Sequence, residues 1–345
     1  MLADIKSMTL SELSDFVTSN GFPRFRAKQI FDWLNKNITS FDEMRNIPTD
    51  LRQFLEISSY ISVANIEKKL VSRYDNTVKY LFSFNDGECV EAVVMSYKFG
   101  HTICISTQIG CKMGCTFCAT GKSGFSRNLS PSEMLAQIEA AQRDLGVRIS
   151  NIVLMGMGEP LDNYDNVIRF IELVSSNSGL NIGTRHITLS TCGIVPKIYE
   201  LAKHRFGITL SVSLHAPNDQ IRRKTMPIAR TYSIDELLQA CRDYFKTTGR
   251  RVSFEYSMIS GVNDSDANAR ELTQRLEGMN CHVNLIPVNT VEDTGYIKSN
   301  IKRQQSFIDI LAEKNITATV RRTLGSDINA SCGQLRRNYY KKGGK

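Results

Sequence analysis

The sequence lacks the features that would place a chain of 345 residues in a membrane or outside the cell. No apolar run approaches the roughly 20 residues that a membrane-spanning helix requires. The first residues, Met1 to Lys6, lack the apolar core of a signal peptide. We therefore expect a cytoplasmic protein with no membrane association, whose nine cysteines are reduced and available for metal binding or chemistry.

Acidic residues are also too few to balance the basic ones. The chain has 35 Asp and Glu against 43 Lys and Arg, a formal net charge of +8. A basic surplus favours nucleic acid or an acidic membrane surface as a partner, and it carries no information about the fold. The length allows one large domain and a small one, with a substantial core.

Three of the nine cysteines stand in one short loop, at Cys111, Cys115 and Cys118. Thiolates are soft ligands that suit iron–sulfur clusters, zinc and copper(I). A four-iron cluster held by three cysteines keeps one iron open for a small molecule, as catalytic metal sites do. A zinc site or plain buried thiols are the alternatives. Zinc normally takes four ligands, and no C-x2-C or H-x3-H partner occurs elsewhere in the sequence.

The first 58 residues favour a small helical domain. Thr9 and Glu12 are spaced as a capping box, and apolar residues follow them at helical spacing. A second apolar periodicity runs through 27–34, and Pro48 precedes a third short helix.

Residues 59–100 favour strands instead, with a hairpin turn at 85–87. The strand predicted at 89–95 holds one acid, Glu91, among apolar residues. A buried acid is costly unless it is paired or used, so the pattern alone favours a Glu91 that faces solvent.

From Thr102 onward, strand and helix patterns alternate. We expect strands at 102–107, 151–155, 186–190, 208–214, 252–258, 282–286 and 317–320. The clearest helix opens with Ser130-Pro131-Ser132-Glu133 and ends at Gly146. Repeated β–α units with right-handed crossovers predict an α/β barrel, open or closed, whose active site lies at the carboxyl ends of its strands.

Small polar residues follow several of these strand ends, and their convergence on one barrel mouth would form a binding pocket. The cysteine loop follows the first strand. The later strand ends carry Gly158 and Glu159, then Ser190, then Ser213, Leu214 and His215, and finally Asn289.

Four segments together carry a resemblance to a known family. They are Cys104-Ile-Ser-Thr-Gln-Ile-Gly-Cys111-Lys-Met-Gly-Cys115-Thr-Phe-Cys118-Ala-Thr-Gly121, Gly156-Met-Gly-Glu-Pro160, Ser213-Leu-His-Ala-Pro-Asn-Asp219 and Ala330-Ser-Cys-Gly-Gln-Leu335. The chain resembles the radical S-adenosylmethionine (SAM) RNA methyltransferases, which act on C-2 of an adenine in 23S ribosomal RNA and of the adenine next to the tRNA anticodon.

The resemblance covers nearly the whole chain and implies a partial (β/α)6 radical SAM barrel with an N-terminal RNA-binding extension. We accordingly divide the chain into a helical accessory domain, a β-rich extension, the barrel, and a C-terminal catalytic cysteine loop with a basic tail. The divisions are 1–58, 59–100, 101–322 and 323–345.

The resemblance also implies roles for individual residues. Cys111, Cys115 and Cys118 would bind a [4Fe–4S] cluster. Cys332 would carry a methyl group, Cys104 would be its partner thiol, and Glu91 would be the proton acceptor, which revises the solvent-facing interpretation of Glu91. The SAM-contacting positions would be Gly158, Glu159, Ser190, Ser213, Leu214, His215 and Asn289. The remaining Cys89, Cys192, Cys241 and Cys281 are interpreted as structural.

The implied reaction is a relay. Cys332 takes a methyl group from one SAM, and a radical formed from a second SAM activates that methyl group for addition to C-2 of adenine. Glu91 then removes the C-2 proton, and Cys104 attacks the sulfur of Cys332 to release the RNA, which leaves a disulfide. This chemistry requires Cys104 and Cys332 to lie close together in the fold.

The implied partners are 23S rRNA, tRNA and an electron donor of the flavodoxin or ferredoxin type. We expect the protein to be a monomer. Basic clusters suited to RNA are Arg222, Arg223 and Lys224, then Arg250 and Arg251, then Arg321 and Arg322, and in the tail Arg336, Arg337, Lys341 and Lys342. Two alternatives are open: methylation at adenine C-8, and a non-catalytic RNA-binding protein with a structural cluster.

Overall fold

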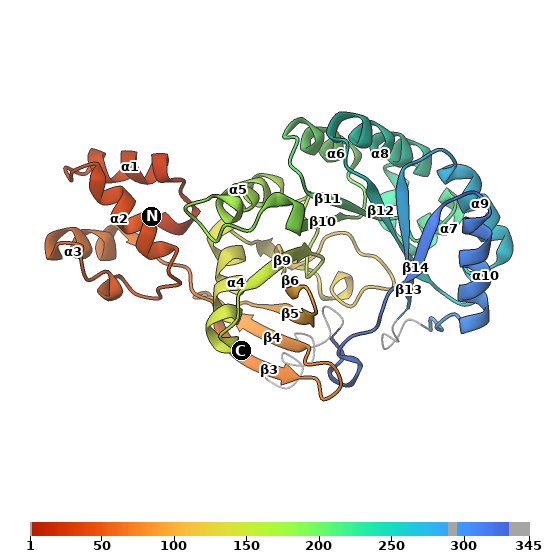
Figure 1. Ribbon diagram of the computed structural model, residues 1–345, viewed down its shortest axis with the longest axis horizontal. Coiled ribbons are helices and arrows are strands. Elements are labelled where there is room, and N and C mark those ends of the chain that lie inside the picture. Colours follow the sequence, from red (N-terminus) through yellow and green to blue (C-terminus); the bar gives the residue numbers. More distant parts are fainter. Residues whose placement is uncertain (1, 289–294, 331–345) are drawn as a thin grey trace.

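The computed structural model describes residues 2–288 and 295–330, and its centre is a ten-stranded sheet (Figure 1). The strands lie in the order β14-β13-β12-β11-β10-β9-β6-β5-β4-β3. Neighbours from β14 to β6 pair in parallel, and those from β6 to β3 pair antiparallel. The strands are β3 (Asn65–Val71), β4 (Val78–Ser83), β5 (Cys89–Tyr97), β6 (Gly100–Cys104), β9 (Ile149–Leu154), β10 (Ile187–Thr191), β11 (Thr209–Ser213), β12 (Val252–Met258), β13 (Cys281–Pro287) and β14 (Thr317–Val320).

Helices connect the successive parallel strands and lie on the outer face of the curved sheet (Figure 1). The sheet ends in two separate edge strands, β14 and β3, so the parallel part is a partial barrel. The prediction of an α/β partial barrel is therefore confirmed. The connecting helices are α4 (Pro131–Leu145), α5 (Tyr164–Ser175), α6 (Val195–Lys203), α7 (Asp219–Thr225), α8 (Ile234–Thr248), α9 (Asp266–Leu276) and α10 (Ile301–Ala312).

Helix α4 shows how local sequence sets an element. The Ser130 hydroxyl accepts a hydrogen bond from the Glu133 N–H, and the Glu133 carboxylate accepts one from the Ser130 N–H. Pro131 occupies the first turn, where its missing N–H costs nothing. Gly146 ends the helix with φ +63°, a conformation that glycine adopts without strain.

The first barrel strand is shorter than the predicted 102–107, because β6 ends at Cys104. The main-chain groups of Ser106 bond to the Gln137 side chain: the Ser106 N–H donates to Oε1 at 2.9 Å, and Nε2 donates to the Ser106 carbonyl at 3.0 Å. The chain then forms a small second hairpin from β7 (Gln108–Gly110) and β8 (Phe125–Asn128). This hairpin encloses the cysteine loop.

The N-terminal segment forms a helical unit with its own apolar core at one end of the molecule (Figure 1). A buried ion pair between Lys6 and Glu139 joins this unit to α4. Arg169 on α5 donates two hydrogen bonds to the Glu12 carboxylate. Its elements are β1 (Ala3–Asp4), α1 (Leu10–Ser19), α2 (Phe25–Leu34), α3 (Thr49–Ser58) and β2 (Ser59–Tyr60). Within the described residues, no helix combines the length and apolarity needed to cross a bilayer.

Candidate active site

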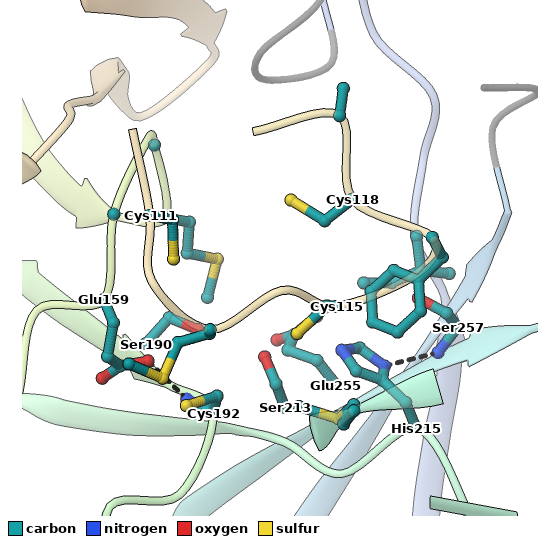
Figure 2. A pocket seen from close by; sticks show the side chains of 18 of the residues that line it. Cys111, Cys115, Cys118, Glu159, Ser190, Cys192, Ser213, His215, Glu255 and Ser257 are labelled. Atoms are coloured by element: carbon teal, nitrogen blue, oxygen red, sulfur yellow. Dashed lines mark hydrogen bonds between the residues drawn. The ribbon is translucent and has the colours of Figure 1, made fainter. Parts of the chain in front are cut away.

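A cavity of about 300 Å³ lies at the carboxyl ends of the parallel strands, and the cysteine loop forms one side of it (Figure 2). The predicted residues that line it are Cys111, Cys115, Cys118, Gly158, Glu159, Ser190, Ser213 and His215. The structure thus brings together side chains that the sequence separates by about a hundred positions. Leu214 is fully buried beside them, and Asn289 lies outside the described residues.

The cysteine loop is held from both ends. The Cys111 N–H donates to the Gly124 carbonyl at 2.8 Å, and the Thr116 N–H donates to the Thr225 carbonyl, at the end of α7, at 2.9 Å. Gly110 has φ +79°, and a Cβ there would lie 2.0 Å from the Gly124 oxygen, so only glycine permits this turn. The loop is therefore fastened to both β8 and the β11–α8 connection.

The three thiols surround an open space (Figure 2). Among the residues that the structure describes, no three His, Cys, Asp or Glu side chains gather tightly enough to hold one metal ion. Three thiolates can supply three of the four protein ligands of a [4Fe–4S] cluster and leave one iron open for a small molecule. The donor set and its placement therefore fit a [4Fe–4S] cluster.

Burial raises the pKa of the Cys111 thiol to about 12 and raises that of Cys115 as well. Both thiols therefore carry protons at neutral pH until a metal displaces them. Cluster assembly in this loop must release protons.

Glu159 is enclosed where β9 meets the cavity. Its carboxylate accepts hydrogen bonds from the N–H groups of Leu161 at 3.0 Å and Cys192 at 2.7 Å. Burial raises the pKa of the Glu159 carboxyl. Gly158 precedes it with φ +102°, where a Cβ would lie 2.6 Å from Gln108 Cβ. The carboxylate retains lone pairs for an ammonium group or a ribose hydroxyl.

His215 is a neutral ring in the cavity wall. Its Nδ1 accepts a hydrogen bond from the Ser257 N–H at 2.8 Å, and the Phe117 ring lies edge-on at 4.8 Å between centroids. Burial lowers the pKa of His215 to about 3. The ring proton must therefore sit on Nε2, which makes that atom a hydrogen-bond donor.

Glu255 on β12 lines the same cavity, although the sequence patterns did not predict it as a site residue. Its carboxylate accepts hydrogen bonds from Ser211 Oγ at 2.7 Å and from Asn284 Nδ2 at 2.9 Å, and burial raises its pKa. The signal was present, since Glu255 is the one acid in an otherwise uncharged strand, as Glu91 is in its own. Cys192, interpreted as structural, also lines the cavity.

Arg222 is not the RNA-facing residue that its basic cluster predicted. Its side chain is fully buried, and its guanidinium donates to the carbonyls of Cys192 at 2.6 Å and Leu214 at 3.3 Å. One turn of α7 directs it inward, while Arg223 and Lys224 face outward. Arg222 therefore supports the strand ends beneath the cysteine loop.

A second cavity of about 290 Å³ adjoins the first, and the two share Met155, Ile286 and Arg321. Cys104, at the end of β6, lines this second cavity, and so does Ala330, the last described residue. Cys332 lies outside the described residues, but the chain reaches the wall of the Cys104 cavity two positions before it.

Glu91 does not face solvent, so that interpretation was wrong. Only 1% of the residue is exposed, and its carboxylate lies 2.9 Å from the equally buried ammonium of Lys79. Lys79 also donates to the Asn329 carbonyl at 2.8 Å. The ion pair with Lys79 thus offsets the cost of burying the Glu91 carboxylate. Glu91 lies on β5, next to the strand that carries Cys104.

The turn between β3 and β4 holds the segment that leads to Cys332. The Asp327 carboxylate accepts hydrogen bonds from Ser72 Oγ at 2.7 Å and from the Arg73 N–H at 2.9 Å. The Gly325 N–H donates to Asp75 Oδ2 at 2.8 Å. Three hydrogen bonds therefore fasten residues 325–327 beside the second cavity.

Two family models match the chain. The radical SAM superfamily model matches residues 105–273, and the model of the ribosomal RNA large subunit methyltransferase N-terminal domain matches residues 3–61. The second match coincides with the helical unit, and the first with the barrel from Ile105 to α9.

Similar proteins cover the full length. The chain is 52% identical, over all of its length and 99% of the relative, to the probable dual-specificity RNA methyltransferase RlmN of Clostridium tetani. It is 54% identical to the same-named protein of Alkaliphilus oremlandii, over 97% of this chain and 98% of the relative. A solved radical SAM methyltransferase from Sphaerobacter thermophilus superposes with a TM-score of 0.92 at 44% identity, over 96% of this chain and 98% of that one.

Proposed function

The chain belongs to the family of radical SAM dual-specificity RNA methyltransferases, and from that premise we propose that it methylates C-2 of adenine through a methyl group carried on Cys332. The adenines would be one in 23S rRNA and the one next to the tRNA anticodon. One observation carries this proposal: the thiol-lined cavity and the Cys104 cavity share a wall of Met155, Ile286 and Arg321. A methyl group held in the second cavity would therefore lie next to chemistry in the first.

Cys111, Cys115 and Cys118 would hold the [4Fe–4S] cluster, and SAM would bind in the space beside them. Glu159 and the Nε2–H of His215 offer an acceptor and a donor at that space, and Ser190 and Ser213 add hydroxyl groups. Leu214 and Asn289 complete the proposed set. When bound, the cluster and SAM supply a 5′-deoxyadenosyl radical.

The chain's own residues would perform the polar steps. Cys332 accepts a methyl group by displacement, because adenine C-2 has no lone pair with which to attack the methyl group directly. Glu91, next to the Cys104 strand, accepts the C-2 proton. Cys104 then attacks the sulfur of Cys332, which releases the methylated RNA and forms a disulfide that needs later reduction.

RNA would bind through backbone contacts to basic residues around the site. Arg321 and Arg322 line the second cavity, and Arg223 and Lys224 lie on the surface of α7. We further propose a flavodoxin or ferredoxin type electron donor, a monomeric and cytoplasmic enzyme, and divisions of the chain near residues 58, 100 and 322.

The test is an anaerobic reaction of the reconstituted protein with a reductant, methyl-labelled SAM and transcripts of 23S rRNA or tRNA. We expect 5′-deoxyadenosine, and mass spectrometry of digested RNA should place the new methyl group on C-2. In the Cys332→Ala variant, neither the protein nor the RNA should acquire the labelled methyl group. In the control variant Cys281→Ala, which changes a buried core residue, both should acquire it. A methyl group on C-8, or a protein that forms no 5′-deoxyadenosine, would refute the proposal.

A further inference from the structure

The hairpin between β5 and β6 exposes an aromatic side chain that the fold does not require. Tyr97 pairs with Gly100, so Lys98 and Phe99 form the two-residue turn. The Phe99 side chain is 73% exposed. Turns of this kind prefer Gly, Asn or Asp, and an exposed phenylalanine ring gains nothing from the core.

The geometry of the turn depends on Gly100 and not on Phe99. Gly100 has φ +124°, and a Cβ there would lie 2.5 Å from Ser150 Oγ. Phe99 has no such constraint, because its backbone φ is not positive. The backbone of the turn therefore explains Gly100, but it does not explain why position 99 is a phenylalanine.

Phe99 extends an aromatic stack that begins inside the active site. Its ring stacks on Tyr97 with 5.0 Å between centroids and 6° between planes. Tyr97 in turn lines the second cavity together with Cys104. The pair therefore forms one aromatic platform from the wall of the Cys104 cavity to the surface.

The charged residues that share the second cavity with Tyr97 are basic. Among the described residues that line the second cavity, the charged ones are Arg321 and Arg322, and both are exposed. Lys98, also exposed, sits beside Phe99 in the turn. An exposed aromatic face bordered by cations suits single-stranded nucleic acid, whose bases stack on rings while its phosphates contact the cations.

We propose that Phe99, backed by Tyr97, is a stacking platform for an unpaired base next to the target adenine in the RNA strand. This inference rests on the proposed function and adds a contact that selects RNA with an unstacked neighbour. Moving an adenine out of its stack leaves its neighbour without a stacking partner, and the Phe99 ring replaces the lost contact.

The experiment compares the dissociation constants of two RNA oligonucleotides that contain the target adenosine. One is intact, and in the other both neighbours of the adenosine are abasic. We expect Phe99→Ala to bind intact RNA about tenfold more weakly than the unchanged protein. Both proteins should bind the abasic RNA equally, because it has no base to stack.

Three further variants sharpen this comparison. Phe99→Trp should retain binding, because a larger ring also stacks, whereas Phe99→Leu should behave like Phe99→Ala although it is apolar. Tyr199→Ala, which removes an aromatic ring 39% exposed on α6, is the matched control and should bind both RNAs normally.

The inference is overturned if Phe99→Ala binds intact RNA normally, or if it weakens binding of both RNAs to the same extent. The second result would instead assign Phe99 to a contact with protein or backbone. Failure of the proposed function would give a different result: the protein without substitutions would bind RNA but would form no 5′-deoxyadenosine. Thermal unfolding of each variant confirms that it is folded.

Discussion

The ammonium of Lys79 lies 2.9 Å from the carboxylate of Glu91, and neither side chain is more than 1% exposed. The same ammonium donates to the Asn329 carbonyl, three positions before Cys332. One buried cation therefore positions both the proposed proton acceptor and the segment that leads to the proposed methyl carrier. Removing it should affect the two together.

Lys79→Met should lower the free energy of unfolding by about 3–5 kcal/mol, because it leaves the Glu91 carboxylate buried without its cation. Urea unfolding monitored by circular dichroism measures this loss. Lys28→Met breaks the exposed pair with Asp32 and should cost no more than about 0.5 kcal/mol. Equal losses in the two variants would contradict the role of the buried pair. Lys79→Met combined with Glu91→Gln should recover part of the stability.

Cys115→Ala should prevent cluster assembly, because it removes one of only three thiols in the loop. The reconstituted protein should fall from about four irons per chain to nearly none and lose its visible absorbance. Iron and sulfide analysis measures this. Cys241→Ala removes a fully buried thiol on the core-facing side of α8, and this variant should keep its irons. A variant of Cys115 with a full iron content would rule out the loop as the cluster site.

Cys104→Ala should trap the enzyme on its RNA, since no thiol then attacks the sulfur of Cys332. A covalent protein–RNA species should accumulate and survive a denaturing gel. The double variant with Cys332→Ala should form none, because the bond to RNA starts from that residue. Release of methylated RNA at the normal rate by Cys104→Ala would remove Cys104 from the mechanism.

His215 should make stability depend on pH. Burial lowers its pKa from 6.5 to about 3, so below pH 6.5 the unfolded chain binds a proton that the folded chain refuses. The free energy of unfolding should therefore fall as the pH drops from about 6.5 toward 3. His215→Asn, whose side-chain oxygen can still accept the Ser257 N–H bond, should lose about 1 kcal/mol less between pH 7.5 and 5.5. Urea unfolding at the two pH values measures the difference, and identical pH dependence in both proteins would contradict it.

Local sequence patterns predicted most of the fold. The predicted strands 252–258 and 317–320 coincide with β12 and β14, and the capping residues around Ser130 delimit α4 as expected. Caps and apolar periodicity act within a few residues, so they can be read directly from the sequence. The strand predicted at 102–107 was too long, because a side chain from a distant helix, Gln137, takes over the main-chain bonds of Ser106.

The environments of charged residues were harder to predict. Glu91 and Arg222 were both interpreted as solvent-facing, and both are buried. The partner of Glu91 is Lys79, on a neighbouring antiparallel strand, and the partners of Arg222 are carbonyl oxygens at two strand ends. Such partners follow from strand order and register, which local sequence does not contain. The family resemblance changed the interpretation of Glu91 from a solvent-facing residue to a proton acceptor, but it gave no reason to expect a buried Arg222.

The hydrogen bonding of β5 to β6 limits how this enzyme can be shortened for engineering. Five residue pairs, from Val93–Cys104 to Tyr97–Gly100, join the extension to the barrel. A fragment that began at β6 would expose this strand as an unprotected edge, which invites aggregation during expression. A shortened form should therefore keep β3, β4 and β5 together with the barrel, and it should also keep the N-terminal unit, whose Lys6 pairs with the buried Glu139 on α4.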